Sequence, residues 1–509
     1  MERLASKSQT KSSGSKYVAL AFIWGLIAKV LDAGMKLFTV PLLLHHYGST
    51  NFGVISLAIS VNAYLQLLDL GINTGAVKFF SQWIKEGKRE LVDSVARTSI
   101  SFYGLVGVVN ALILLLIAFY GIDLFKVSGK QAEVLQNMLF ILAGFAIFNW
   151  ATSVFSQLLV ANEKIYYIQQ INMARSVVSF LAVLFTIYFK LSLISYFILF
   201  TGINSLVFVP FYIVSKRDKL ISGFKPALDF NNFLVIFRYS IAIIAMGIFQ
   251  MTASKSRPII LSIFANEGLK AVAEFRILET ITIFVISLGG MFSSIFLPKT
   301  SRLVLEKDKT AMENFAYEST LYTSIICVLL CAPFMLCAEE IITIYVGVQF
   351  AFLSKWLIAW MIVILSYLHS SPVNSLLLAK GRTKTLVYST AFSCIVSLCV
   401  NALLSTRIGV GAAIIGHSVY ILIQMSLYYL YFNNKILGLR SWLVFKSFIV
   451  PAAIGGVSIF AVTLLPFEFE NLFFQCIIKS TVFLILFALL LMSFRVVAPK
   501  EFLGRLRKK

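Results

Sequence analysis

Four basic side chains in this sequence stand within strongly apolar stretches, where an ionised group is costly. Lys presents a compact positive charge, and Arg presents a planar fork that can bind phosphate through two parallel hydrogen bonds. We therefore expect these side chains to bind an anion, with phosphate or diphosphate as the first candidate and a sugar carboxylate as the second. The four candidates for substrate binding are Lys29, Lys36, Lys255 and Arg257.

Acidic residues accompany these cations, as charge partners or as sites for a coupling ion. Lys29, Asp32 and Lys36 are spaced by three and four positions, which places them on one face of a helix. The remaining acidic candidates are Asp69, Glu274 and Glu279. One alternative is that such pairs only hold helices together. Against it, Lys255 and Arg257 have no acidic residue within one helical turn in the sequence.

The composition explains where such charges must be held. The chain has 509 residues, of which 59% are apolar and only 13% are charged, whereas about a quarter of the residues of soluble domains are charged. The mean hydropathy is +0.88. A charge within a membrane span by default faces the interior of a helix bundle or a water-filled path. The net charge of +21 is dispersed over short connections, so we expect no nucleic acid partner.

Fourteen apolar runs are long enough to cross a bilayer, which takes about 20 residues each. They lie at 17–44, 52–80, 98–120, 138–160, 165–189, 192–214, 239–264, 272–298, 319–337, 356–378, 385–404, 411–432, 447–465 and 471–496. If the amino terminus is cytoplasmic, the connections on that side contain 30 Lys and Arg residues and the opposite connections contain six. This bias predicts an all-α multi-pass membrane protein with both termini in the cytoplasm.

Two short motifs recur at nearly the same offset, which indicates a duplicated chain. Pro41–Tyr47 resembles Pro258–Phe264, 217 residues later, and Leu158–Ala161 resembles Leu376–Ala379, 218 residues later. Duplicated transporters place the substrate site where the repeats meet. The predicted organisation is an unstructured cytoplasmic tail at 1–16, a six-helix lobe at 17–214, a cytoplasmic linker at 215–238, a second six-helix lobe at 239–432, two further helices within 447–496 and a basic cytoplasmic tail at 497–509.

The sequence resembles a known family along most of its length. The segments that carry the resemblance are Pro41-Leu-Leu-Leu-His-His-Tyr-Gly-Ser-Thr-Asn-Phe-Gly53, Leu68-Asp-Leu-Gly-Ile-Asn73, Leu377-Leu-Ala-Lys-Gly-Arg382, Asn401 and Gly409-Val-Gly-Ala-Ala413. They are similar to the polysaccharide transporters, the Wzx-like flippases of the multidrug/oligosaccharidyl-lipid/polysaccharide (MOP) superfamily. The resemblance implies a V-shaped pair of lobes with a central cavity. It also implies that the four cations named above match cavity residues of the family.

The function that follows from the resemblance is flipping of undecaprenyl-diphosphate-linked oligosaccharide units, such as those of O-antigen or capsule, to the outer leaflet of the bacterial cytoplasmic membrane. Expected partners are this lipid-linked substrate, membrane lipid, and glycosyltransferases and a glycan polymerase. No P-loop motif occurs, so no nucleotide is expected, and the His and Cys residues lack metal-ligand spacing. The rivals are a cation-coupled drug exporter of the same superfamily and a membrane glycosyltransferase or polymerase. No enzyme activity and no cofactor are expected.

Overall fold

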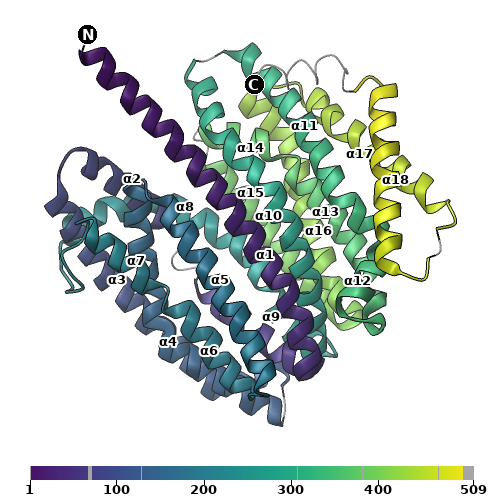
Figure 1. Cartoon of the computed structure of the whole chain (residues 1–509), viewed down its shortest axis with the longest axis horizontal. Helices are drawn as coiled ribbons and strands as arrows, with labels where there is room; N and C mark the ends of the chain where they lie inside the picture. Colours follow the sequence, from purple (N-terminus) through teal and green to yellow (C-terminus); the bar gives the residue numbers. More distant parts are fainter. Residues whose placement is uncertain are drawn as a thin grey trace. The chain divides into compact units, whose positions relative to one another are not determined.

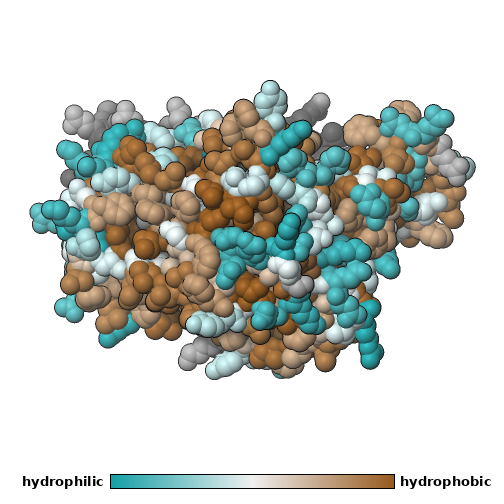
Figure 2. Space-filling view, turned by 90° about the horizontal axis from the view of Figure 1, so that it is seen from below, coloured by the Kyte–Doolittle hydropathy of each residue, from teal (hydrophilic) through white to brown (hydrophobic). Residues whose placement is uncertain are grey.

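The computed structural model describes residues 2–66, 72–127, 129–306, 308–380, 383–467 and 469–496. Within these ranges every regular element is a helix (Figure 1). Ten helical stretches among the described residues are long and apolar enough to cross a membrane. Apolar side chains cover wide areas of the face drawn in Figure 2. The prediction of an all-α multi-pass membrane protein is confirmed.

The chain divides into two compact units. Unit 1 contains residues 1–276 and 402–410, and unit 2 contains residues 277–401 and 411–509. This division follows packing, whereas the predicted linker at 215–238 rests on the repeated motifs, so the position of the duplication boundary stays a prediction. The helices after that linker, up to residue 276, pack with the first unit.

Unit 1 is a bundle in which α3, α4, α6 and α7 run as neighbours (Figure 1). Its helices are α1 (Glu2–Leu65), α2 (Ile72–Lys85), α3 (Arg89–Leu116), η2 (Ile117–Gly121), η3 (Ile122–Phe125), α4 (Lys130–Ala161), α5 (Ile165–Tyr188), α6 (Leu193–Ser205), α7 (Phe208–Arg217), α8 (Phe230–Lys255), α9 (Arg257–Phe264) and the first turns of α10 (Gly268–Glu306). A core around Phe80, Tyr103 and Phe155 is fully buried between α2, α3 and α4.

Unit 2 contains the remainder of α10 and the helices that follow it. These are α11 (Lys309–Leu336), α12 (Ala338–Val346), η4 (Val348–Leu353), α13 (Ser354–Leu368), α14 (Ser371–Ala379), α15 (Thr383–Ile408), α16 (Val410–Leu427), η5 (Tyr428–Leu437), α17 (Ser441–Thr463) and α18 (Leu472–Ser493). The short stretch 402–410 at the junction of α15 and α16 packs with unit 1.

Glycine and proline explain where several helices break. Gly48 has φ of 80° and ψ of 164° inside α1, a conformation that favours glycine. Pro258 lies at the start of α9, and because it has no N–H it cannot continue the hydrogen bonding of α8. Pro372 stands in the same way at the start of α14. Two of the predicted spans, at 239–264 and 356–378, are therefore broken helices.

The predicted unstructured tail at 1–16 is wrong in one respect, because α1 begins at Glu2. This stretch contains no proline and one glycine, so helix can extend into it at the modest cost of its polar residues. The predicted basic tail at 497–509 lies outside the described residues.

Helix α1 and helix α5 pack against each other in a parallel register. Ser176 contacts Asp32, Tyr47 contacts the carbonyl of Leu191, and a Cβ on Gly25 would lie 4.0 Å from the side chain of Gln169. Each of these pairs is separated by 144 residues. A constant separation means that the two helices run in the same direction without slipping, which fixes how their polar side chains meet.

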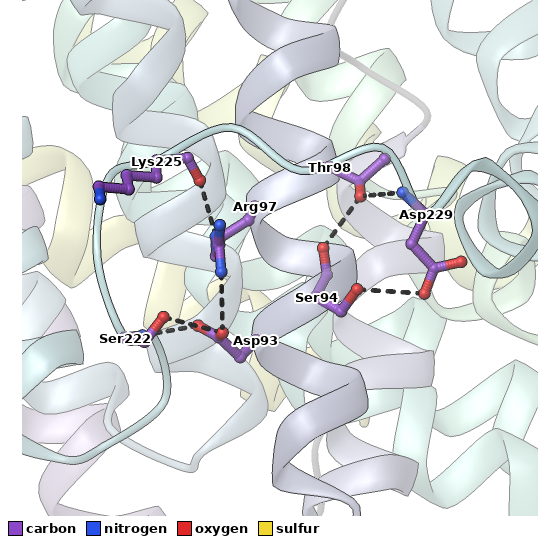
Figure 3. A network of polar contacts seen from close by, with 7 residues as sticks. All are labelled: Asp93, Ser94, Arg97, Thr98, Ser222, Lys225 and Asp229. Carbon is purple, nitrogen blue, oxygen red and sulfur yellow. Dashed lines mark hydrogen bonds and ion pairs between the residues drawn. The ribbon is translucent and has the colours of Figure 1, made fainter.

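The connection between α7 and α8, residues 218–229, is hydrogen-bonded to side chains of α3 (Figure 3). Asp93 accepts hydrogen bonds from the backbone and hydroxyl of Ser222, and Arg97 donates to the carbonyl of Lys225 at 2.7 Å. Asp229, the N-cap residue of α8, accepts from Ser94 at 3.2 Å. The start of α8 is thereby held to unit 1, in agreement with its place in that unit.

Candidate functional site

A polar cavity of about 700 Å³ lies within unit 1. Residues of α1, α4, α5, α6 and α7 line it, together with Arg276 from the beginning of α10. Its polar lining includes the amides of Asn62, Gln66 and Asn172 and several hydroxyl groups. In a chain that is mostly apolar, such a cavity is the default candidate for a binding site.

The carboxylate of Asp32 is the centre of the charged groups in this cavity. Lys36 Nζ lies 2.7 Å from Asp32 Oδ2, and Arg175 Nη2 lies 3.9 Å from Asp32 Oδ1. Ser176 donates a hydrogen bond of 2.6 Å to Asp32 Oδ1. The parallel register of α1 and α5 brings these four residues together, because it sets residues 32 and 36 beside residues 175 and 176.

Arg175 and Arg276 are two cations of the cavity lining that were not predicted from the sequence, and Arg175 is the one in contact with Asp32. Its Nη1 also lies 3.4 Å from Asn204 Oδ1, so the guanidinium joins α5 to α6 as well as to α1. The available signal was a single cation in the middle of an otherwise uncharged apolar run, 165–188. That signal is weak in sequence, because no second charge on α5 marks the face that meets α1.

The cavity has more positive than negative charge. Lys36, Arg175 and Arg276 line it, and Asp32 is the carboxylate among the lining residues that the structure describes. Lys36 and Arg175 share the single carboxylate of Asp32, at 2.7 and 3.9 Å, so these three groups carry a net positive charge, which favours a negative ligand. The surrounding amides and hydroxyls can donate to and accept from sugar hydroxyls. The arrangement suits a ligand with both an anionic group and a polar, uncharged part.

The other predicted cations stand apart from the cavity lining. Lys29 is exposed, on the same helix as Asp32. Lys255 is half-buried at the last position of α8. Arg257 is 6% exposed, and its Nε donates to the carbonyl of Ala253 at 2.9 Å. That contact places a cation at the carboxyl end of α8, where the helix dipole favours positive charge.

The predicted acidic residues are likewise spread over the fold. Glu274 is buried in the part of α10 that packs with unit 1, and Glu279 is buried in the part that packs with unit 2. Asp69 lies outside the described residues. Of the eight predicted site residues, the structure brings together Asp32 and Lys36 in the cavity.

Comparison with known proteins gives one sequence match and a set of structural matches. Residues 27–185 match the MatE family model. No curated protein is significantly similar to this chain in sequence.

The structural matches extend over most of the chain. The lipid II flippase MurJ, in an inward closed conformation, is 16% identical with a TM-score of 0.72, over 93% of this chain and 99% of that chain. An inward-facing multidrug resistance MATE family transporter of the MOP superfamily is 14% identical with a TM-score of 0.65, over 87% and 99%. A eukaryotic MATE transporter, AtDTX14, is 13% identical with a TM-score of 0.56, over 86% and 98%. The chain thus carries a MatE match over residues 27–185 and has, over most of its length, the fold of the MOP superfamily transporters.

Proposed function

We propose that this protein is a transporter that flips an undecaprenyl-diphosphate-linked oligosaccharide across the bacterial cytoplasmic membrane, from the inner to the outer leaflet. The observation that carries the proposal is the cavity of unit 1, in which Lys36 and Arg175 both lie beside the carboxylate of Asp32. A lipid II flippase is among the proteins with the same fold. Lipid II is one example of a lipid-linked glycan. For the present protein, we propose an undecaprenyl-diphosphate-linked oligosaccharide as the glycan that is carried.

The mechanism follows from the chemistry of such a substrate. A diphosphate loses hydration when it leaves water, and fixed guanidinium and ammonium groups replace that hydration with charge-assisted hydrogen bonds. The amides and hydroxyls of the cavity bind the sugars, while the prenyl tail stays in the lipid. Alternating access then exposes the headgroup to the other side. An inside-negative potential favours outward movement of an anion by up to about 2.3 kcal/mol per charge per 100 mV.

The predicted residues outside the cavity lining keep their proposed roles. Lys29 is one helical turn before Asp32. We propose that the anionic headgroup contacts Lys29 before it enters the cavity. Lys255 and Arg257 are proposed to contact the headgroup in another state of the transport cycle. Asp69, Glu274 and Glu279 are proposed as charge partners or ion-coupling residues. The glycosyltransferases that assemble the glycan, and the polymerase that uses it, are the proposed partners.

Transport by purified protein in liposomes tests this function. A fluorescent polyprenyl-diphosphate-linked glycan is added to the lipid, and its movement between leaflets is measured by accessibility to a membrane-impermeant quencher. Arg175→Gln and Lys36→Gln should each lower the rate by about tenfold to a hundredfold, because a hydrogen bond to a charged group contributes about 1.5–3 kcal/mol. Lys36→Arg, which keeps the charge, should retain most of the rate.

The controls separate transport from folding. Lys88→Gln removes an exposed cation between α2 and α3, and it should leave the rate unchanged. Each variant is compared at equal amounts of monodisperse protein. Wild-type rates in both Gln variants of the cavity would remove the cavity from the transport path, and the proposed function would lose its main support.

A drug exporter of the same superfamily is the second candidate, because one observation favours it. The MatE match covers the part of the chain that contains Asp32, and Asp32 is a carboxylate in the cavity. A carboxylate suits an organic cation or a coupling ion. Transport of a dicationic dye by the wild-type protein, with no movement of the polyprenyl diphosphate, would favour this candidate.

A further inference from the structure

A second group of cations lies at the amino end of α5, outside the cavity. Lys164 is the N-cap residue of α5. Ile168, Asn172 and Arg175 follow at spacings of four, four and three residues and line the cavity. Lys164 is therefore on the helix face that continues into the cavity. At 1.5 Å per residue, the backbone of Lys164 is about 16 Å along α5 from that of Arg175.

The carboxylate of Asp218 forms ion pairs with two of these cations, Lys164 and Arg217. Lys164 Nζ lies 3.5 Å from Asp218 Oδ2, and Arg217 Nε lies 3.6 Å from Asp218 Oδ1. Asn162 donates to Asp218 Oδ2 at 3.4 Å. The side chain of Asp218 is 16% exposed, compared with 57% for Arg217 and 30% for Lys164. The acid is thus on the inner side of the group, and the cations face outward.

An aromatic ring orients the same two cations. The guanidinium carbon of Arg217 is 5.3 Å from the centre of the Tyr167 ring, and Lys164 Nζ is 5.4 Å from it. Both distances are within the range of cation–π attraction. A carboxylate and a ring together restrict these two long side chains. Because the side chains are already ordered, they lose less rotamer freedom when a ligand binds.

The charge around the pair leaves room for an anion. Lys216 and Lys219 are exposed and lie next to Arg217 and Asp218 in sequence, and Glu163 is the exposed acid next to Lys164 in sequence. With Asp218, that makes two acids against the four cations of this group. A phosphate can therefore bind to the outer side of Arg217 and Lys164 without displacing Asp218.

We propose that Lys164 and Arg217, held by Asp218 and Tyr167, form an entry site for the diphosphate of a polyprenyl-linked headgroup at the amino end of α5. The headgroup binds there first and then moves along α5 to Arg175. The entry site rests on the proposed function for its ligand, and it adds to that function a second anion site outside the cavity. The amino end of α5 is on the side predicted to be cytoplasmic, where such substrates are made.

Binding is measured on the full-length protein in nanodiscs of phosphatidylcholine, with undecaprenyl diphosphate as the probe. The cavity is first disabled by Lys36→Gln and Arg175→Gln together, so that the remaining binding reports the entry site. In this background Arg217→Ala and Lys164→Ala should each weaken binding about tenfold, and higher salt should weaken it further. Tyr167→Leu, which changes no charge, should weaken it about threefold through lost orientation. Lys88→Ala, a cation paired with Glu86 at 2.8 Å, is the matched control and should have no effect.

Each outcome decides between the site and its alternatives. Equal affinity in the background and in Arg217→Ala or Lys164→Ala overturns the entry site. Complete displacement of the probe by phosphatidylglycerol at 30 mol% would show that a glycerophospholipid occupies the group, and this also overturns it. Loss of binding in both Ala variants, with no transport by the wild-type protein, would support the entry site and contradict the proposed function. Transport by the wild-type protein, with binding unchanged in the variants, would support the proposed function and contradict the entry site.

Discussion

The polar side chains of unit 1 and unit 2 have different surroundings: those of unit 1 border an open cavity, and those of unit 2 are packed among aromatic rings. In unit 1, Asp32, Lys36 and Arg175 meet beside an open volume of about 700 Å³. In unit 2, His369 is fully buried with its ring 3.8 Å from that of Phe448, stacked at an angle of 17°. The first arrangement leaves charge available to a ligand. The second fills its space with rings, so its polar atoms are used for packing.

The contacts of His369 show how unit 2 achieves this. Its Nε2 and Tyr429 Oη are 2.7 Å apart, and the two rings lie nearly parallel. Ser441 then donates to the carbonyl of Tyr429, which ties α17 to η5. A second histidine, His417, accepts a hydrogen bond from Trp360 at 3.1 Å. A polar residue inside a helix bundle is therefore a sign of a binding site when space is open beside it, and a sign of helix packing when rings surround it.

The largest expected effect breaks the packed region of unit 2. Phe448→Ala removes a ring that is 6% exposed and stacked on His369, and it should lower the free energy of unfolding by about 3 kcal/mol. Phe460→Ala is the control, because Phe460 is on the same helix but 64% exposed. Thermal unfolding in detergent measures both. The midpoint should fall clearly for Phe448→Ala and little for Phe460→Ala, and equal shifts would contradict the assignment of this region to packing.

A smaller effect is expected where two helices of unit 1 approach closely. A Cβ on Gly53 would lie 2.2 Å from the carbonyl oxygen of Leu269, so Gly53→Ala forces α1 and the start of α10 apart. The cost should be about 1–3 kcal/mol. A Cβ on Gly104 in α3 would meet nothing within 4 Å, so Gly104→Ala should be neutral or slightly stabilising. Thermal unfolding again distinguishes them, and a neutral Gly53→Ala would show that this approach is looser than described.

The class of fold could be predicted from the sequence because a bilayer leaves few solutions for so apolar a chain. The breaks at Pro258 and Pro372 interrupt apolar runs without making them more polar, so hydropathy alone joins each pair of pieces into one span. The grouping of α8 with unit 1 depends on hydrogen bonds such as Arg97 to Lys225, between residues 128 apart. No local pattern encodes such a contact.

The candidate site was predicted in part for a similar reason. The spacing of Asp32 and Lys36 is a property of one helix, so periodicity was sufficient to pair them. Arg175 joins them only through the parallel register of α1 and α5, which sequence periodicity does not specify. Arg257 is buried in contact with the carbonyl of Ala253. Its charge was visible in the sequence, but this contact with the end of the preceding helix, α8, was not.

The charge of Asp32 distinguishes an anionic from a cationic substrate in the cavity of unit 1. Asp32→Asn removes the carboxylate that lies near Lys36 and Arg175, so the cavity becomes more basic. For an anionic lipid-linked substrate, affinity should stay the same or rise by up to about tenfold, which corresponds to about 1.4 kcal/mol. For an organic cation it should fall by at least a similar factor. Equilibrium binding of undecaprenyl diphosphate and of a dicationic dye, measured on the same variant, separates the two proposed functions.

The smallest effect concerns an ion pair in unit 2, between Glu340 of α12 and Lys479 of α18, whose side chains are 13% and 18% exposed. Burial alone would raise the pKa of Glu340, but hydrogen bonds from Lys479 and Gln475 and the nearby positive charge lower it below its ordinary value. The pair therefore stabilises the fold at pH above about 4.3, the ordinary pKa of Glu. This contribution is lost as the pH falls through the lowered pKa of the folded state.

Glu340→Gln should consequently cost about 1 kcal/mol at pH 7, and this difference should shrink as the pH falls below the ordinary pKa of Glu and through the lowered pKa of the folded state, where the wild-type carboxyl group itself becomes protonated. The unfolding midpoints of the two proteins should approach each other as the pH falls below about 4.3, the ordinary pKa of Glu. Transport at pH 7 should not change, because this pair is in unit 2 and the cavity that carries the proposed function is in unit 1. A loss of transport in a stably folded Glu340→Gln would mean that charge in unit 2 also acts on the substrate, and the division between a charged, open unit and a packed one would fail.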